Sequence, residues 1–411
     1  MLKKIPTENT LTGMYIHEFC APWLSIPFWR KSFLVASPEL CAEVRSCGIA
    51  ELIIDTNKGI DEPADAPAPA APPEASAAIA AAAAAVPAAS EADHDIAPTS
   101  TAAEYDRAAS VISRSKQAMT TMFHEARMGR LGNLEQTAEL VDAVAGSVIR
   151  NPHAMIALSR LKTADDYTYM HSVAVCAMMI ALARQLGMDE EEARLCGQAG
   201  LLHDIGKMAI EPEILNKPGR LTEQEYVRVQ EHPRAGHAIL QSADAIPPAT
   251  LDVCLHHHEK FDGTGYPHGL KGDAISLYAR MGAVCDVYDA ITSNRPYKSG
   301  WCPAESLRRM SDWAKEGHFD PAVFGAFVKC VGIYPIGTLV KLTSGRLAVV
   351  IDINRSLLRP IVKTFFSSKA MTYVQPQVID LSLLAGKEEI VSREDAHTWN
   401  LTDIDKYWHQ A

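Results

Sequence analysis

A run of apolar residues at three- and four-residue spacings extends from about residue 104 to residue 330 and limits the fold more than any other feature. Leu140, Val141, Val144 and Val148 illustrate the spacing, which places them on one face of a helix. The same spacing predicts further helices, separated by short Gly- and Pro-bearing loops, at 173–186, 190–203, 223–240, 251–258 and 277–292. We therefore expect an all-α domain at 104–330.

The segments on either side of this domain have other patterns. Residues 59–103 consist mainly of Ala, Pro and acidic residues, which bury too little apolar surface to offset chain entropy, so we expect a flexible linker. Residues 1–58 are typical of a small α+β module, with strands at 14–16, 33–35 and 52–55 and a helix at 37–47. Residues 331–411 predict a β-rich extension that begins with a hairpin at Ser344-Gly345. The fold class is mainly α.

Composition limits the partners and the compartment. The net charge is −11 with His neutral, and so acidic a chain lacks the basic surface that nucleic-acid polymers require. No stretch of about twenty apolar residues could span a bilayer, so we expect no membrane partner. The nine Cys are odd in number and form no CxxC pair, which predicts reduced thiols and a cytoplasmic protein.

Seven His and Asp residues in the helical domain are candidate metal ligands. They are His171, His203, Asp204, His232, His257, His258 and Asp286. Helical bundles build metal sites from side chains that project inward from facing helices, and imidazole with carboxylate suits Fe, Mn, Co or Zn. Seven ligands are too many for one catalytic ion with an open position, but they suit two ions that share a carboxylate.

Glycines follow these residues closely, in HDIGK at 203–207 and HHEKFDGTGYP at 257–267. A Gly beside ligands allows a tight turn and lets a phosphate approach the backbone. The second segment presents Tyr266 near the expected metals, where its ring could stack on a base. The alternative is a surface turn in which Tyr266 covers the core.

Residues 150–330 resemble the HD-GYP family of bacterial cyclic di-GMP phosphodiesterases. The resemblance includes both Gly-bearing segments, DYTYMH at 166–171, DVYDA at 286–290 and RPYK at 295–298. The first sixty residues and the linker also look like an N-terminal module found in some members. The resemblance implies an HD-type helical bundle that hydrolyses cyclic di-GMP to linear pGpG, and it leaves open whether the end product is pGpG or GMP.

The resemblance also implies roles for particular residues. His171, His203, Asp204 and Asp286 would hold one metal, and His232, His257 and His258 the other, with Asp204 bridging. Catalysis would depend on Asp204 and on Lys207, which would neutralise charge or protonate the leaving oxygen. The substrate would be bound by Gly265, Tyr266, Pro267, Asp289, Arg295 and Lys298. Among these, Arg295 and Lys298 would clamp the phosphates, and Asp289 would brace the Gly-rich loop without touching metal.

Some family members carry a Glu four residues before the first His and bind a third metal. Tyr167 occupies that position here, so we expect two divalent ions. Fe and Mn are favoured, with Zn, Co and Ni as alternatives. His256 would be a neighbour of the ligands.

Two other functions remain open. The chain could be a cyclic di-GMP sensor that cleaves weakly and acts through protein partners, or an HD-type hydrolase of another nucleotide. The N-terminal module could form a homodimer or bind a signalling protein.

Overall fold

The computed structural model describes residues 2–19, 33–35, 37–45, 51–60, 99–128, 134–161, 167–217, 219–243, 246–293, 300–354 and 356–409. The chain forms two compact units, Met1–Pro72 and Pro73–Ala411. Most of the predicted linker at 59–103 lies outside the described residues, and the four-part division made from the sequence stays a prediction.

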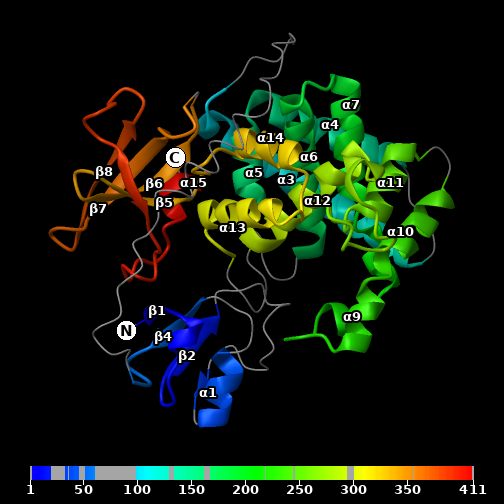
Figure 1. Cartoon of the computed structure of the whole chain (residues 1–411). Helices are drawn as coiled ribbons and strands as arrows, with labels where there is room; N and C mark the ends of the chain where they lie inside the picture. The colour runs from blue at the N-terminus through cyan, green and yellow to red at the C-terminus, as the bar shows by residue number, and fades with distance from the viewer. Residues whose placement is uncertain are drawn as a thin grey trace. The chain divides into compact units, whose positions relative to one another are not determined.

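In its described residues, the first unit contains a four-stranded antiparallel sheet, a short 3-10 helix (Thr7–Asn9) and an α-helix (Figure 1). Its elements are β1 (Leu2–Pro6), β2 (Tyr15–Phe19), β3 (Phe33–Leu34), α1 (Pro38–Arg45) and β4 (Glu51–Asp55), in the sheet order β1-β4-β2-β3. Alternate residues such as Ile16, Leu52 and Ile54 are buried in its core. The expected strands and helix are confirmed. The sequence did not indicate β1, because LKKIP has little apolar alternation and pairs with β4, which is distant along the chain.

The second unit is mainly helical, as expected. The helices are α3 (Thr101–Arg127), α4 (Leu134–Arg150), α5 (Pro152–Ser159), α6 (Tyr167–Gln185), α7 (Glu190–Leu202), α8 (Pro212–Leu215), α9 (Glu223–Val229), α10 (His232–Gln241), α11 (Pro248–His256), α12 (Leu277–Thr292), α13 (Pro303–Lys315) and α14 (Pro321–Val331). The single helix expected at 223–240 is two helices, because Pro233 cannot donate a backbone hydrogen bond and instead starts α10.

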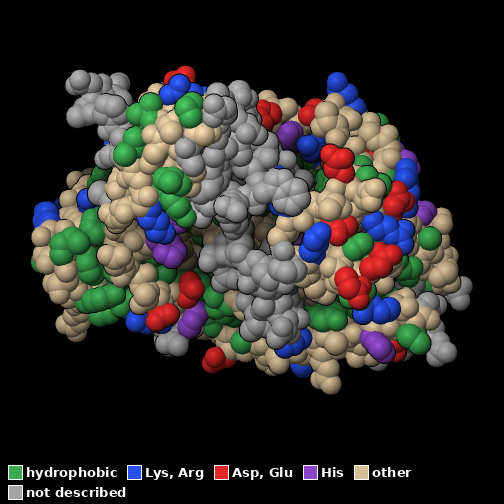
Figure 2. Space-filling model, turned by 90° about the horizontal axis from the view of Figure 1, so that it is seen from below, with side chains coloured by type: hydrophobic (Ala, Val, Ile, Leu, Met, Phe, Trp, Pro, Cys, Tyr) green, Lys and Arg blue, Asp and Glu red, His purple; other side chains and the backbone are tan. Residues whose placement is uncertain are grey.

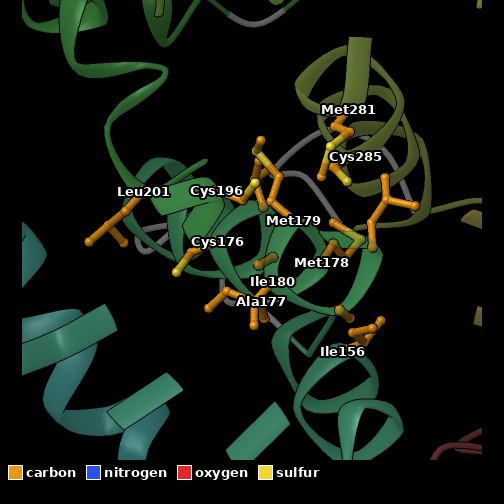
Figure 3. Close-up of a cluster of buried hydrophobic side chains, with 14 of the residues drawn as sticks. Ile156, Cys176, Ala177, Met178, Met179, Ile180, Cys196, Leu201, Met281 and Cys285 are labelled. Atoms are coloured by element: carbon orange, nitrogen blue, oxygen red, sulfur yellow. The ribbon is translucent and has the colours of Figure 1, made fainter. Parts of the chain in front are cut away.

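Helix α6 is the centre of the second unit. Its residues from 170 to 183 are buried on every side of the helix, which is typical of a helix enclosed by others. Figure 3 shows its Cys176, Met178 and Met179 among side chains of neighbouring helices, including Cys196 of α7 and Cys285 of α12. A rigid central helix gives the side chains at its first turn a fixed position.

A five-stranded antiparallel sheet follows the helices, as predicted. It comprises β5 (Leu339–Leu342), β6 (Arg346–Asp352), β7 (Ile361–Ser367), β8 (Thr372–Asp380) and β9 (Ile390–Arg393), in the order β8-β7-β6-β5-β9, and the short α15 (Lys406–His409) comes after it. The expected β5–β6 hairpin turns at Gly345, whose φ is 82°. The sheet packs on α3 and α5 through a cluster that includes Tyr105, Phe365 and Trp408.

Two further observations concern membrane spans and thiols. Within the described ranges, no helix is both long enough and apolar enough to cross a bilayer. Seven described cysteines are free, and all but Cys302 are buried.

Candidate metal centre

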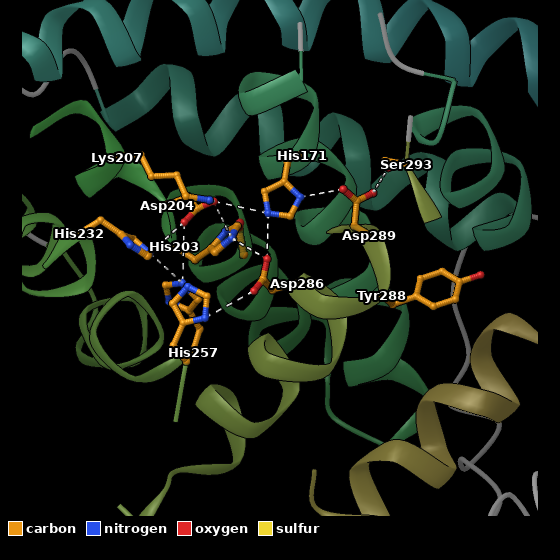
Figure 4. A network of polar contacts seen from close by, with 12 residues as sticks. His171, His203, Asp204, Lys207, His232, His257, Asp286, Tyr288, Asp289 and Ser293 are labelled. Carbon is orange, nitrogen blue, oxygen red and sulfur yellow. Dashed lines mark hydrogen bonds and ion pairs between the residues drawn. The ribbon is translucent and has the colours of Figure 1, made fainter. Parts of the chain in front are cut away.

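Five helical elements bring the seven candidate ligands together (Figure 4). His171 projects from the first turns of α6, and Asp286 from the middle of α12. The others lie at helix ends: His203 and Asp204 after α7, His232 at the start of α10, and His257 and His258 after α11. All are buried except His258, whose side chain is 24% exposed.

One group of ligand atoms surrounds the carboxylate of Asp286. His171 Nε2 lies 2.9 Å from Asp286 Oδ1 and 3.4 Å from Asp204 Oδ2. His203 Nε2 lies 3.4 Å from Asp204 Oδ2 and 3.8 Å from Asp286 Oδ1. Each of His171, His203 and Asp286 offers one ligand atom within 4.8 Å of the others, a spacing that could hold one ion.

A second group consists of three imidazoles. His232, His257 and His258 also offer ligand atoms within 4.8 Å of one another. The Nε2 atoms of His232 and His257 are 3.4 Å apart, and they lie 3.3 and 3.8 Å from Asp204 Oδ1. The two oxygens of Asp204 therefore face different groups, which is the arrangement that a bridging carboxylate needs.

The Nδ1 atoms of four histidines form hydrogen bonds with oxygen atoms outside the centre, so their Nε2 atoms face inward. His171 Nδ1 lies 2.7 Å from Asp289 Oδ2, and the other three Nδ1 atoms contact backbone carbonyls. These pairs are His203 with Gly200 at 2.7 Å, His232 with Val229 at 2.7 Å, and His257 with Val253 at 3.0 Å. A Nδ1–H that donates in this way fixes the tautomer and leaves the Nε2 lone pair available to a cation.

The polar atoms at the centre fit divalent cations. His203 Nε2 and Asp204 Oδ1 are buried and have no hydrogen-bond partner among the described residues. Such atoms are costly unless something binds them, and imidazole nitrogen with carboxylate oxygen is a typical ligand set for divalent metals. The cluster could therefore hold metal ions at both groups.

The carboxylates of the first group are ionised. Burial opposes this ionisation, but the ammonium of Lys207 and the His203 ring outweigh it and hold the pKa of Asp204 well below its usual range. The pKa of Asp286 is also well below its usual range, because contacts with His171 and His203 outweigh its burial.

His171 and His258, one from each group, differ in charge state. Burial would lower the pKa of His171, but hydrogen bonds to Asp204, Asp286 and Asp289 outweigh it and raise the pKa to about 10. Burial lowers the pKa of His258 to about 3. The three-histidine group thus offers a neutral ring, whereas an ion at the first group must displace a proton.

Lys207 lies beside the shared carboxylate. It belongs to a short 3-10 helix (Ile205–Ala209) that follows Asp204, and its Nζ donates a hydrogen bond to Asp204 Oδ2. The Lys207 side chain is 23% exposed, whereas Asp204 is 1% exposed. Lys207 therefore provides a charged donor between the buried ligands and solvent.

Gly206 has a packing role that the sequence did not indicate. A Cβ at this position would lie 1.9 Å from the carbonyl oxygen of His232 and 2.4 Å from the backbone nitrogen of Gly236. The glycine thus allows the segment after Asp204 to touch α10, which brings Asp204 to His232. The approach of a phosphate to this backbone, expected from the sequence, stays a prediction, and Gly236 was not singled out.

The ring of Tyr266 stacks on His258, with centroids 4.7 Å apart and an interplanar angle of 25°. Gly265 permits the turn, because a Cβ there would lie 2.3 Å from the backbone nitrogen of Lys260. The carbonyl of Pro267 accepts a hydrogen bond of 3.0 Å from Arg234 Nη2. Tyr266 therefore lies against a candidate metal ligand, and its role in substrate binding stays a prediction.

Asp289 contacts a candidate ligand. Its Oδ2 lies against His171 Nδ1 and its Oδ1 accepts a hydrogen bond of 3.2 Å from Ser293 Oγ, so it orients His171. The sequence contained a signal for this position, because residues three apart on a helix lie on the same face, and Asp289 follows the candidate ligand Asp286 by three residues. That it braces the Gly-rich loop stays a prediction.

The remaining site predictions concern peripheral positions. His256 is turned away from the centre, with Nδ1 2.7 Å from Asp252 Oδ1 and Nε2 3.0 Å from His268 Nδ1. Arg295 and Lys298 lie outside the described residues, as does the side chain of Tyr167.

Comparisons with known proteins agree with this arrangement. The model of the HD domain family matches residues 149–323, and that of a domain of unknown function, DUF3391, matches residues 2–137. The chain is 48% identical over 410 residues to a cyclic di-GMP phosphodiesterase of Pseudomonas aeruginosa, covering 99% of this chain and 96% of that protein.

Two other relatives match the helical domain. A cyclic di-GMP phosphodiesterase response regulator of Xanthomonas campestris is 41% identical over 180 residues, which cover 42% of this chain and 47% of that protein. A 3′3′-cGAMP-specific phosphodiesterase of Vibrio cholerae is 35% identical over 176 residues, which cover 43% and 41%.

Proposed function

This chain belongs to the HD-GYP family of cyclic di-GMP phosphodiesterases, and we propose that it hydrolyses a 3′–5′ phosphodiester bond of cyclic di-GMP, so that the end product is linear pGpG or, after a second cleavage, GMP. The observation that carries this proposal is the convergence of seven ligand side chains in two groups around the shared carboxylate of Asp204. The likeness to a relative of that name over nearly the whole chain supports the substrate.

The chain's own residues would hold two divalent ions. His171, His203 and Asp286 would bind one, His232, His257 and His258 the other, and Asp204 would bridge them. Bound ions would polarise the phosphodiester and activate the attacking water. Fe or Mn is favoured over Zn, Co or Ni, although His and Asp ligands accept all of these metals.

Lys207 would supply a proton during cleavage. Its ammonium lies against Asp204 and is the more exposed member of that pair, so a substrate phosphate can reach it. We propose that Nζ neutralises the charge that develops on the phosphate or protonates the leaving ribose oxygen.

The substrate would be bound beside His258. Tyr266 is half-buried against that ring and would stack on a guanine base. Gly265 and Pro267 would shape this loop, while Arg295 and Lys298 would clamp the phosphates. For Asp289 we now propose positioning of His171 in place of substrate contact.

A small-molecule substrate also suits the charge of the chain. The net charge is −11, and Figure 2 shows Lys and Arg side chains interspersed with Asp and Glu on one face of the molecule. This favours a compact nucleotide over a nucleic-acid polymer or a membrane. A cytoplasmic location, and a homodimer or signalling partner bound by the N-terminal module, remain predictions.

Replacement of Asp204 tests this function. In anaerobic protein loaded with Fe(II) or Mn(II), Asp204→Ala should lose cyclic di-GMP turnover by about a thousandfold, because several kcal/mol of transition-state stabilisation depends on the two ions. The matched control is Asp273→Ala, which removes a carboxylate that is 96% exposed.

The readout is the time course of pGpG and GMP formation, measured by chromatography on a panel that includes 3′3′-cGAMP. Retained turnover in Asp204→Ala would contradict the proposal. Wild-type protein that binds cyclic di-GMP without cleaving it would favour the sensor, and preference for another panel member would favour the other-nucleotide hydrolase.

A further inference from the structure

Glu259 is a buried carboxylate that the proposed reaction does not use. It follows His258 directly and is 3% exposed. Its Oε1 accepts a hydrogen bond of 2.7 Å from the backbone N–H of His268, and its Oε2 accepts one of 3.0 Å from the N–H of Leu270. Because both oxygens accept backbone donors, the side chain is committed to the loop and is absent from the clusters of candidate metal ligands.

These two hydrogen bonds attach the end of the loop from Gly263 to Leu270 to Glu259, which precedes the loop. Gly265 packs against the backbone of Glu259, since a Cβ at 265 would lie 2.5 Å from the Glu259 Cα. The N–H of Tyr266 also donates to the carbonyl of His258, at 3.3 Å. The loop is therefore fixed at its start, its middle and its end to the two residues 258 and 259.

The closed loop determines where Tyr266 lies. The Tyr266 ring stacks on His258, and the next carbonyl, that of Pro267, accepts a hydrogen bond from Arg234 of α10. Arg234 is 49% exposed, so water can replace its hydrogen bond to Pro267. Glu259 is buried and accepts from two backbone N–H groups, so its removal would leave both N–H groups unpaired. Glu259 is thus the stronger of the two attachments.

We propose that Glu259 is a positioning residue for substrate binding, which fixes the 263–270 loop so that the Tyr266 ring forms the stacking surface for a guanine base beside the metal centre. This inference rests on the proposed function. It predicts that Glu259 acts on substrate affinity through Tyr266 and does not act on the metal ions.

A double-mutant cycle tests the proposal. We would compare Glu259→Gln, Tyr266→Ala and the double variant in metal-loaded protein, measuring KM, kcat and metal content. Glu259→Gln should raise KM on the order of tenfold, because a carboxamide retains only one acceptor oxygen. The kcat should change less than about threefold and the metal content should be unchanged. The double variant should have the KM of Tyr266→Ala alone, since both changes remove the same surface.

The control is Glu388→Gln. The Glu388 carboxylate also accepts a hydrogen bond from a backbone N–H, that of Ser344 in the turn between β5 and β6. This variant should leave KM unchanged. An effect of Glu259→Gln that adds to that of Tyr266→Ala, or that appears as lost metal, would overturn the proposal.

Hydrogen exchange distinguishes this failure from a failure of the proposed function. The amides of His268 and Leu270 should exchange faster in Glu259→Gln than in wild type, whatever the substrate is. Unchanged exchange would overturn the positioning role, whereas faster exchange in a protein that does not turn over cyclic di-GMP would overturn only the proposed function.

Discussion

The two groups of candidate ligands share Asp204 but differ in chemistry. The group around His171 and Asp286 pairs imidazoles with ionised carboxylates, and the pKa of His171 rises to about 10. The group around His232 contains three imidazoles, and the pKa of His258 falls to about 3. The difference teaches that one buried centre can hold a protonated histidine, His171, in one ligand group and a neutral histidine, His258, in the other.

The largest expected effect is that of replacing Asp204, the shared ligand, compared with replacing His232, which belongs to one group. Asp204→Ala should lose both ions, whereas His232→Ala should lose the ion of the three-histidine group and retain the other, because Asp204 turns one oxygen to each group and His232 belongs to one of them. Turnover should fall on the order of a thousandfold in Asp204→Ala. Elemental analysis of the purified variants gives the metal content, and equal loss in both variants would show that the groups are not separable.

A smaller effect is expected from Asp289→Asn, which alters the orientation of His171 without removing a ligand. Carboxylates that hold a ligating histidine typically contribute about 10- to 100-fold to metal affinity. The loss should be confined to the His171 group, so metal titration should show one weakened and one unchanged site. Weakening of both sites would contradict the separation of the groups.

The pH dependence should also differ between the groups. Because the pKa of His171 is raised from 6.5 to about 10, an ion at that group displaces a proton throughout the range between them, and affinity should rise up to about tenfold per pH unit. His258, with a pKa of about 3, releases no proton above pH 5. Calorimetry of His232→Ala in buffers of different protonation enthalpy would count the protons released at the first group.

The same pKa shift should make the folding stability of chelator-treated protein fall as the pH rises, whereas it makes metal affinity rise. The raised pKa of His171 contributes stability that is fully present below pH 6.5 and is lost as the pH rises toward 10. Urea denaturation at pH 6 and pH 9 in EDTA should therefore show lower stability at the higher pH. Higher stability at pH 9 would show that His171 is not the protonated member of its group.

The smallest expected effect lies at the far end of α7, the helix that carries His203 at its C-terminal end. Asp189 and Glu192 form a reciprocal capping box there, with hydrogen bonds of 2.8 and 3.0 Å. Asp189→Ala should lower stability by about 1 kcal/mol and leave both metal sites and turnover unchanged. Thermal unfolding beside a turnover assay checks this, and altered metal content would show that the helix end and the site are coupled.

The sequence predicted the elements of the site better than their contacts. Apolar spacing located α7, α11 and α12 closely but started α6 six residues late, after His171, and the ligand residues were recognised from residue type and from the motifs around them. It did not predict the break between α9 and α10, where Pro233 outweighed a continuous helical pattern. Nor did it assign Asp289 to His171, because these residues are 118 positions apart and their contact depends on how α12 packs on α6.

The sequence by itself determined the chemistry that this protein can offer: helices from apolar periodicity, imidazoles and carboxylates as ligands, and glycines where the chain must turn. Tertiary structure alone decided which nitrogen of each histidine faces inward, which carboxylate is shared, and that Gly206 serves close contact with α10. The physical reason is that residue type fixes the donors and acceptors, whereas their distances and charge states arise only when segments distant along the chain are buried together.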